Sequence, residues 1–317
     1  MDRENLPLII PIDKPEDMTS FDLVAIARRK LGIKNIGHLG TLDPMATGLV
    51  LLGINGAARV MEYLDMEMKE YACEGRLGFT SDTQDIWGDV KETGIKRDIN
   101  PFEFEDAIKS LEGVRKQEPP IYSALKLDGK KLYEYAREGK DIDLSKKTRK
   151  VYIENINLTS FDGKDFSFTA RVSKGTYIRT ICNDLGEVLG TGAIMTSLRR
   201  TRIGNISLEL AITHKELMDN SEDWIYENAL RVESLLSDFG SARTVGDWEE
   251  KMFVSGVWLR PEQFETLDDG KNMDSFPLSL PEDYPNYIRV YNRQGTLLGM
   301  GIKGEGGTLK AKKVFNR

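Results

Sequence analysis

One short loop, Gly37 to Pro44, carries residue types that can do acid–base or nucleophilic chemistry. Its glycines, Gly37 and Gly40, favour a tight and exposed loop. Asp43, held out on such a loop with His38 nearby, can serve as a nucleophile or a general base. The residues also have a plainer interpretation, because Asp followed by Pro is a common helix start in which the carboxylate caps backbone N–H groups. The local sequence leaves both interpretations open.

Arg179 and Tyr71 are the next candidates. Arg179 closes the run Lys174 to Arg179, at a point where a strand pattern changes to a helical one. Free N–H groups at a helix N-terminus attract anions, and an arginine there can pair with a carboxylate or a phosphate. A surface arginine on the first helical turn is the alternative. Tyr71 lies on the more apolar face of its predicted strand, which is typical of a core tyrosine.

The chain offers little for metal or redox chemistry. It has two cysteines, Cys73 and Cys182, and two histidines, His38 and His214. This composition excludes a disulfide scaffold and a cysteine-rich zinc or iron–sulfur site, and each cysteine is expected to be a small buried side chain. The glycine patterns match no dinucleotide or phosphate-loop fingerprint. We therefore expect no metal and no cofactor.

Positive charge is concentrated in patches of an otherwise acidic protein. The 317 residues carry a net charge of −7, yet residues 123–150 hold nine basic and five acidic side chains, with Tyr133 and Tyr135 among them. Further basic groups lie at 199–202 and 303–317. Basic patches with interleaved aromatic residues favour RNA contact. A solvated helical face is the alternative for residues 123–150.

The spacing of apolar residues predicts the elements that position these side chains. A helix is expected over 20–31, capped by Thr19 or Ser20 and ended by Gly32. No apolar run approaches the roughly 20 residues of a membrane span, and the N-terminus does not resemble a signal peptide. We therefore expect a soluble, cytoplasmic protein of two domains. The other predicted elements are helices over 101–111 and 178–188, strands over 71–79 and 166–172, and a small β unit over 287–314.

Seven motifs occur together along the chain. They are the Gly37–Pro44 loop, Asp13-Lys14-Pro15 with Thr19-Ser20, Tyr71 with Arg76-Leu77-Gly78, Tyr122 to Lys126, Gly129 to Arg137, Lys174 to Thr180, and Leu198-Arg199-Arg200. As a set, and in their order along the chain, they resemble the TruB-type tRNA pseudouridine-55 synthases of bacteria. The resemblance covers roughly Leu8 to Arg202. The tail from about Ser241 resembles the small RNA-binding PUA domain.

The resemblance implies an α+β fold, with a mixed, largely antiparallel sheet flanked by helices and a small C-terminal β-barrel-like PUA domain. It divides the chain into a catalytic domain over 1–240 and a PUA-like domain over 241–317, with 123–150 as a basic RNA-gripping insertion.

The reaction that the resemblance implies is the isomerisation of uridine 55 in the T-arm loop of tRNA to pseudouridine. The base flips out, an aspartate-dependent step breaks the N-glycosidic bond, and the uracil is re-attached through C5. The implied partner is the T-arm stem-loop of tRNA, bound by a monomer without an obligatory protein partner.

Residue roles follow from the same resemblance. Asp43 matches the essential aspartate. Whether it attacks the sugar C1′ or removes a proton from the sugar stays open. Arg179 matches the arginine that pairs with this aspartate, and Tyr71 the tyrosine stacked on the target base. His38 matches the residue that takes the place of the flipped base. The positions that match substrate-binding residues are His38, Tyr177, Leu198, Lys14, Pro15, Lys126, Lys130 and Lys131.

Three positions depart from the family pattern: Asp17 stands where glycine is usual, Leu39 where threonine is usual, and Trp87 where a small or acidic residue is usual. Three other functions stay open. A non-catalytic RNA-binding protein would not need Asp43, Tyr71 and Arg179. The gripping segment and the tail together favour tRNA over another RNA substrate. A glycoside hydrolase would need a second acidic residue as a partner of Asp43, and the sequence offers no candidate for it.

Overall fold

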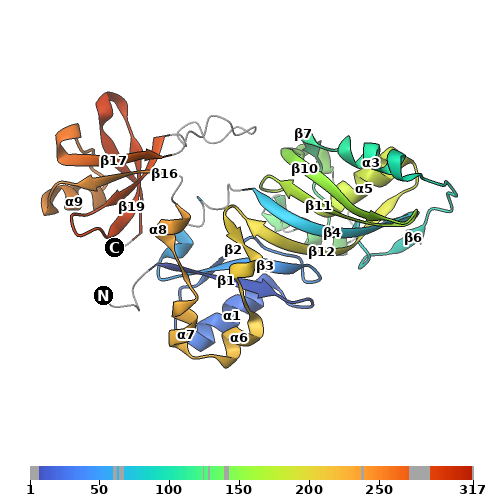
Figure 1. The fold of residues 1–317 in the computed structure, drawn as a ribbon, viewed down its shortest axis with the longest axis horizontal. Helices are drawn as coiled ribbons and strands as arrows, with labels where there is room; N and C mark the ends of the chain where they lie inside the picture. The colour runs from blue at the N-terminus through green and yellow to red at the C-terminus, as the bar shows by residue number, and fades with distance from the viewer. Residues whose placement is uncertain are drawn as a thin grey trace. The chain divides into compact units, whose positions relative to one another are not determined.

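A computed structural model describes residues 7–59, 63, 68–123, 125–127, 129–138, 143–236, 239–270 and 286–315. The chain forms two compact units, whose elements are labelled in Figure 1. Each unit combines strands with helices, so the predicted α+β class is confirmed. Unit 1 comprises Met1–Pro44, Gly48–Met66 and Asn205–Arg317, and unit 2 comprises Met45–Thr47 and Glu67–Gly204.

β1 (Leu8–Lys14) is the central strand of the first sheet in unit 1. It runs antiparallel to β3 (Thr47–Ile54) along its whole length, and nearly all side chains of both strands are buried. Such continuous burial explains why both strands are largely apolar rather than alternating, with Asp13 and Lys14 as polar residues at the end of β1. Three short strands extend this sheet, namely β14 (Ile212–Thr213) and β15 (Leu230–Arg231) beside β1, and β2 (Gly37–Leu39) beside β3.

Helix α1 (Ser20–Leu31) has the predicted bounds. Thr19 accepts a hydrogen bond from the backbone N–H of Asp22, whose carboxylate bonds back to Thr19, and Gly32 ends the helix at a φ of +64°. Both signals are local, which is why the sequence predicts them well. The other helices of this part of unit 1 are α6 (His214–Asp219), which packs on α1, α7 (Glu222–Glu227) and α8 (Val232–Leu235).

The sheet of unit 2 runs in the order β12-β4-β11-β10-β7, and all four pairings are antiparallel. The predicted strands over 71–79 and 166–172 are confirmed as β4 and β11, although β4 ends at Leu77 and the chain turns at Gly78. The bounds are β4 (Lys69–Leu77), β7 (Gly113–Gln117), β10 (Arg149–Phe161), β11 (Asp165–Val172) and β12 (Ala193–Ile203), with a separate hairpin of β5 (Phe79–Ser81) and β6 (Val90–Glu92).

Two helices pack against the sheet of unit 2. α5 (Ile178–Leu189) contacts β12, α3 (Pro101–Lys109) contacts β10, and the helices touch each other (Figure 1). A Cβ at Gly186 would lie 2.1 Å from the backbone nitrogen of Ala193, so only glycine allows α5 to approach this strand so closely. In the described part of the chain, no helix is long and apolar enough to span a membrane.

The two cysteines meet between α5 and β4. The sulfur of Cys73 lies 3.6 Å from that of Cys182, and both side chains are buried, as expected. Burial raises the pKa of the Cys73 thiol well above its usual value. The pair therefore packs between the strand of Tyr71 and the helix of Arg179.

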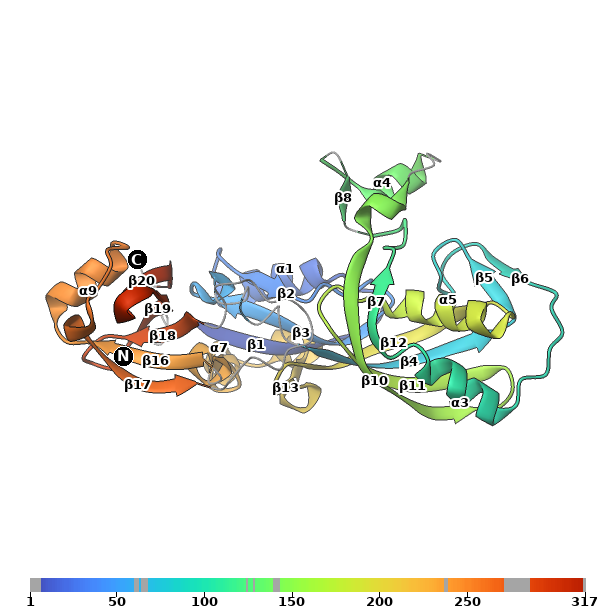
Figure 2. The same ribbon diagram turned by 90° about the horizontal axis from the view of Figure 1, so that it is seen from above.

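Part of the basic segment 123–150 forms a small subdomain of unit 2. β8 (Lys126–Leu127) and β9 (Lys130–Lys131) pair, and α4 (Leu132–Arg137) follows them directly. Figure 2 shows β8 and α4 standing away from the sheet strands of the same unit. Residues 124, 128 and 139–142 of this predicted gripping segment lie outside the described residues.

The C-terminal part of unit 1 holds a five-stranded sheet in the order β17-β16-β18-β19-β20. The predicted small β unit is confirmed, whereas no pairing closes the sheet into a barrel in the part of the tail that is described. Residues 271–285 and 316–317 of the tail lie outside that part. Its elements are β16 (Phe239–Thr244), α9 (Asp247–Val254), β17 (Phe264–Gly270), β18 (Tyr287–Tyr291), β19 (Leu297–Lys303) and β20 (Leu309–Val314), packed around Ala242, Phe253, Leu259, Ile288, Val290, Leu298 and Leu309.

Candidate active site

The loop of Asp43 is fixed by a buried lysine. Lys14, the last residue of β1, is fully buried, and its ammonium donates to the carbonyl oxygens of Pro15 (2.8 Å), Met18 (2.6 Å) and Pro44 (2.9 Å). Three carbonyl acceptors match the three N–H groups of an ammonium and offset its desolvation. Since Pro44 follows Asp43 directly, these bonds fix the backbone beside the carboxylate.

A second bond fixes the other side of this loop. The backbone N–H of Leu42 donates to the hydroxyl of buried Ser20 at the start of α1 (3.0 Å). No helix follows Asp43: residues 44–45 form a turn, and the chain continues directly into β3. The helix-start interpretation of Asp43 is therefore wrong. The residue is a half-buried carboxylate on a loop anchored at both sides.

Two family departures lie close to this loop. Asp17 has a φ of +60°, in the left-handed region, where glycine is the easiest residue and aspartate one of the better tolerated substitutes. Leu39 lies on β2 and is buried, so it adds to the core. Beside it, the Nε2 atom of His38 lies 3.2 Å from the hydroxyl of Thr41.

In unit 2, Arg179 lies at the start of α5 and is buried, not on the surface. Its Nη1 lies 3.2 Å from a carboxylate oxygen of Asp85, and its Nη2 donates to the carbonyl oxygen of Tyr122 (2.7 Å). Asp85 is fully buried, and its other carboxylate oxygen accepts hydrogen bonds from the Thr83 hydroxyl (2.6 Å) and the Trp87 backbone N–H (3.1 Å). The guanidinium is therefore held in a fixed orientation by a buried ion pair.

Sequence reasoning missed Asp85. The sequence does contain a local signal. Thr83 lies two residues before Asp85 and Trp87 two residues after it, and this spacing allows a turn in which both bond to the Asp85 carboxylate. The partner that gives the turn its importance, Arg179, is 94 positions away.

Tyr177 precedes α5 and is fixed through its backbone. Gln117 of β7 bonds to both its N–H (2.7 Å) and its carbonyl oxygen (3.1 Å). Two cations lie near the Tyr177 ring, with the guanidinium carbons of Arg149 and Arg179 at 5.2 and 5.7 Å from its centroid. Gln117 therefore positions the start of the helix that carries Arg179.

Tyr71 and Leu198 lie on neighbouring strands of unit 2. Tyr71 is buried on β4, and the guanidinium carbon of buried Arg200 lies 5.9 Å from its ring centroid. Leu198, on β12, is opposite Cys73, two residues along β4 from Tyr71. Tyr71 and Leu198 therefore lie on adjacent strands of one sheet.

The three lysines of the gripping segment are only partly described. Lys130 forms an ion pair with Glu138, and its ammonium lies 4.8 Å from the ring centroid of Tyr135. For Lys126 and Lys131 the structure describes the backbone, which pairs in one hairpin, and not the side chains. The predicted site residues thus fall into two sets, with Lys14, Pro15, His38 and Asp43 in unit 1 and the rest in unit 2.

Two family models match the chain in succession. Residues 28–178 match the TruB family pseudouridylate synthase N-terminal domain, and residues 179–239 match the tRNA pseudouridylate synthase B C-terminal domain. Asp43, Tyr71, Asp85 and Tyr177 fall in the first match, and Arg179 opens the second.

Curated relatives cover nearly the whole chain. A protein of Clostridioides difficile named tRNA pseudouridine synthase B is 41% identical over 295 residues, which is 92% of this chain and 93% of that protein. A Bacillus subtilis protein of the same name is 37% identical over 317 residues, covering 97% of each.

Solved structures share the fold. An H/ACA ribonucleoprotein bound to a substrate RNA containing 2′-deoxyuridine aligns with a TM-score of 0.72 at 21% identity, over 99% of this chain and 86% of that one. The archaeal box H/ACA Nop10-Cbf5 complex aligns with a TM-score of 0.70 at 23% identity, over 98% and 87%. Together with the family matches and the curated relatives, these similarities show that the chain belongs to the TruB family of pseudouridine synthases.

Proposed function

We propose that this protein isomerises uridine 55 in the T-arm loop of tRNA to pseudouridine. The observation that carries the proposal is the loop of Asp43, whose half-buried carboxylate is flanked by backbone that Lys14 and Ser20 fix in place. A carboxylate that must meet one carbon of a bound sugar needs such a fixed position. The relatives named tRNA pseudouridine synthase B support the same reaction class.

The reaction exchanges one bond to the sugar for another. The N1–C1′ bond breaks, the uracil turns, a C5–C1′ bond forms, and the proton on C5 is lost to water while N1 gains one. No electron is gained or lost overall. In our proposal Asp43 starts the exchange as an ionised carboxylate, and Arg179 pairs with it, which favours the ionised form. Tyr71 stacks on the base and assists the loss of the C5 proton.

The target base must leave its stack before this chemistry starts. Extrusion costs a few kcal/mol, and less from a loop than from a helix. In our proposal His38 takes the place of the flipped base, Tyr177 and Leu198 line the pocket, and Lys126, Lys130 and Lys131 grip the T-arm. Lys14 and Pro15 support the loop of Asp43.

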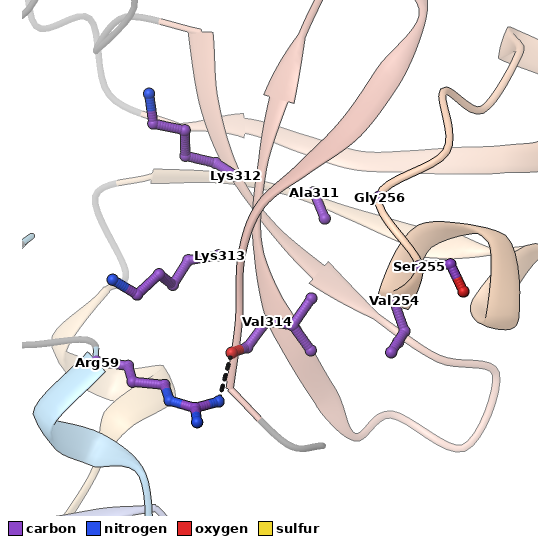
Figure 3. A pocket seen from close by; sticks show the side chains of 8 residues that line it. All are labelled: Arg59, Val254, Ser255, Gly256, Ala311, Lys312, Lys313 and Val314. Atoms are coloured by element: carbon purple, nitrogen blue, oxygen red, sulfur yellow. Dashed lines mark hydrogen bonds between the residues drawn. The ribbon is translucent and has the colours of Figure 1, made fainter.

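The C-terminal tail offers a basic pocket for the same RNA. A cavity of about 310 Å³ is lined by Arg59 of the short helix η2 (Ala57–Arg59), by Val254 to Gly256, and by Ala311 to Val314. Figure 3 shows Arg59, Lys312 and Lys313 on one side of it, with Arg59 donating to the Val314 carbonyl oxygen (3.2 Å). The lining includes three cations and no carboxylate. This favours a phosphate of the RNA backbone.

We therefore propose that residues 241–317 are a PUA-like RNA-binding domain and that 1–240 are the catalytic domain. The second family match, which ends at residue 239, supports this boundary. We also propose that the enzyme works in the cytoplasm as a monomer. Because phosphate contacts dominate such binding, affinity for tRNA should fall steeply as salt rises.

The test uses a T-arm stem-loop with tritium at C5 of its uridines. We expect the wild-type chain to release one equivalent of tritium per RNA, and none when uridine 55 is replaced by cytidine. Asp43→Asn should bind the stem-loop as well as the wild type and release none. Turnover by Asp43→Asn would overturn the role of Asp43. Tight binding without release by the wild type would overturn the enzyme proposal in favour of a non-catalytic RNA-binding protein.

A further inference from the structure

The turn between β5 and β6 exposes two large apolar side chains. Ile86 and Trp87 are each 43% exposed, next to the fully buried Asp85. Exposure of a tryptophan costs hydration free energy unless something else covers it.

The backbone beneath these side chains is firmly held. The N–H of Trp87 donates to the Asp85 carboxylate, and the N–H of Ile86 donates to the Met195 carbonyl oxygen of β12 (2.9 Å). Met195 in turn donates to the carbonyl oxygen of Gln84 (3.1 Å). A Cβ at Gly88 would lie 2.2 Å from the Thr83 hydroxyl, so a larger residue there would displace side chains of the turn. The tip is a rigid extension of the sheet.

The same turn contains a strained residue. Gln84 has a φ of +64°, in the left-handed region that a residue other than glycine rarely adopts. Its side-chain oxygen accepts a hydrogen bond from the Thr180 hydroxyl of α5 (2.8 Å). Strain that is held in place by its surroundings is typical of segments that present a side chain for a function.

The position of the turn ties Trp87 to the reaction. Asp85, two residues before it, is the ion-pair partner of Arg179, whose other nitrogen donates to Tyr122 at the root of the basic segment 123–150. One guanidinium therefore joins the tip, the helix of the site and the RNA-gripping segment. The turn of Trp87 and the root of the basic segment are therefore held by the same side chain.

We infer that Trp87 stacks on an unpaired nucleobase of the T-arm loop beside the target uridine. Proteins read RNA mainly in single-stranded loops, where aromatic side chains stack on splayed bases. A tryptophan on a rigid turn loses little conformational freedom when a base covers it. This inference rests on the proposed function and adds a substrate-positioning residue to it.

The first experiment separates binding from chemistry. With the T-arm stem-loop, Trp87→Ala should raise KM about tenfold and leave kcat within about twofold, which matches the loss of one base–aromatic stack. Trp87→Phe keeps an aromatic face and should recover most of the affinity. The matched control is Phe102→Ala, because Phe102 is 81% exposed on α3 in unit 2 and has no role in the proposed site. It should behave as the wild type.

Three outcomes overturn the inference. They are an unchanged KM in Trp87→Ala, a loss of kcat at unchanged KM, and a failure of Trp87→Phe to recover affinity. The second would mean that Trp87 acts only through Asp85 and Arg179. The third would mean that shape, not stacking, matters. Absence of tritium release by the wild type counts against the proposed function. In that case the inference about Trp87 is tested separately, by comparing the stem-loop affinities of the wild type and the variants.

A second experiment uses the unaltered protein. Stem-loops carrying 4-thiouridine at single loop positions are cross-linked by ultraviolet light and the complex is digested with trypsin. We expect a cross-link in the peptide 77–91, which contains Trp87, from at least one loop position other than 55. If every loop position cross-links only to peptides other than 77–91, the inference is overturned. A tip that binds a protein instead of RNA would give this result.

Discussion

The two units hold their charged site residues in opposite ways. In unit 1 a buried cation, Lys14, bonds to backbone carbonyl oxygens around the loop of Asp43. In unit 2 a buried anion, Asp85, bonds to the side chain of Arg179 itself. The first arrangement fixes a position through the backbone. The second fixes a side chain and balances its charge.

The difference predicts different consequences when each support is removed. Without Lys14, the loop loses its anchor while Asp43 keeps its own charge. Without Asp85, a buried guanidinium loses a buried carboxylate partner, and breaking a buried ion pair is more costly than losing a neutral hydrogen bond. Three substitutions test this contrast, from the largest expected effect to the smallest.

Asp85→Asn should be the most damaging. It keeps the shape of the side chain but leaves Arg179 with an amide, so we expect a loss of about 3 kcal/mol in the free energy of unfolding. Tritium release should fall about a hundredfold or more, because Arg179 loses its fixed orientation. Urea unfolding and single-turnover rates measure the two effects. Asp89→Asn, on the same hairpin and in an exposed pair with Lys91, is the control and should change neither. Wild-type stability in Asp85→Asn would break the comparison.

Lys14→Met should have a smaller effect. Methionine has a side chain of similar length but cannot make the three hydrogen bonds to carbonyl oxygens. We expect their loss to cost about 2 kcal/mol of unfolding free energy. Since the Asp43 loop then moves, kcat should fall about tenfold with little change in KM. Lys30→Met removes a single exposed bond to the Met218 carbonyl oxygen and is the matched control. A loss of RNA affinity at unchanged kcat would show instead that Lys14 serves binding.

Asp184→Asn should have the smallest effect, and a stabilising one. Burial and the nearby Glu187 raise the pKa of Asp184 on α5 to about 6, although Arg115 opposes the shift. A folded-state pKa above the unfolded value of 3.8 means that stability falls as pH rises from about 4 through 6. Removing this charge should stabilise the protein by about 1 kcal/mol at pH 7.5, since the group is partly solvated.

Urea unfolding of Asp184→Asn and the wild type at pH 4 and pH 7.5 measures this difference. It should be near zero at pH 4. If the gain in unfolding free energy of Asp184→Asn over the wild type does not grow with pH, the raised pKa of Asp184 is contradicted. The contrast with Asp85, whose charge is balanced by Arg179, would then be lost.

Local signals in the sequence predict much of the fold. Thr19 and Gly32 set the ends of α1, Asn100 and Pro101 start α3, and Gly190 ends α5. At Asp43 and Pro44 the local signal is ambiguous, and the pairing of β3 with β1 decides against a helix. Long-range pairing of strands thus overrides a local preference there.

The support of the site depends on distant contacts and is harder to predict. Asp85 pairs with a residue 94 positions away, and Lys14 reaches Pro44, 30 positions on. Neither contact leaves a pattern in a single sequence. The family resemblance names Lys14 as a support of the site, and only the structure shows that it acts through three carbonyl oxygens.

The two buried thiols allow local opening of β4 and α5 to be measured in the unaltered protein. Cys73 and Cys182 are the chain's two cysteines, and they lie on the strand of Tyr71 and the helix of Arg179 respectively. A thiol reagent reaches them only when β4 and α5 separate, so its rate of reaction measures local unfolding at the support of the site. A single cysteine introduced on the surface can then be labelled selectively, which gives a fluorescent handle on RNA binding without first removing native residues.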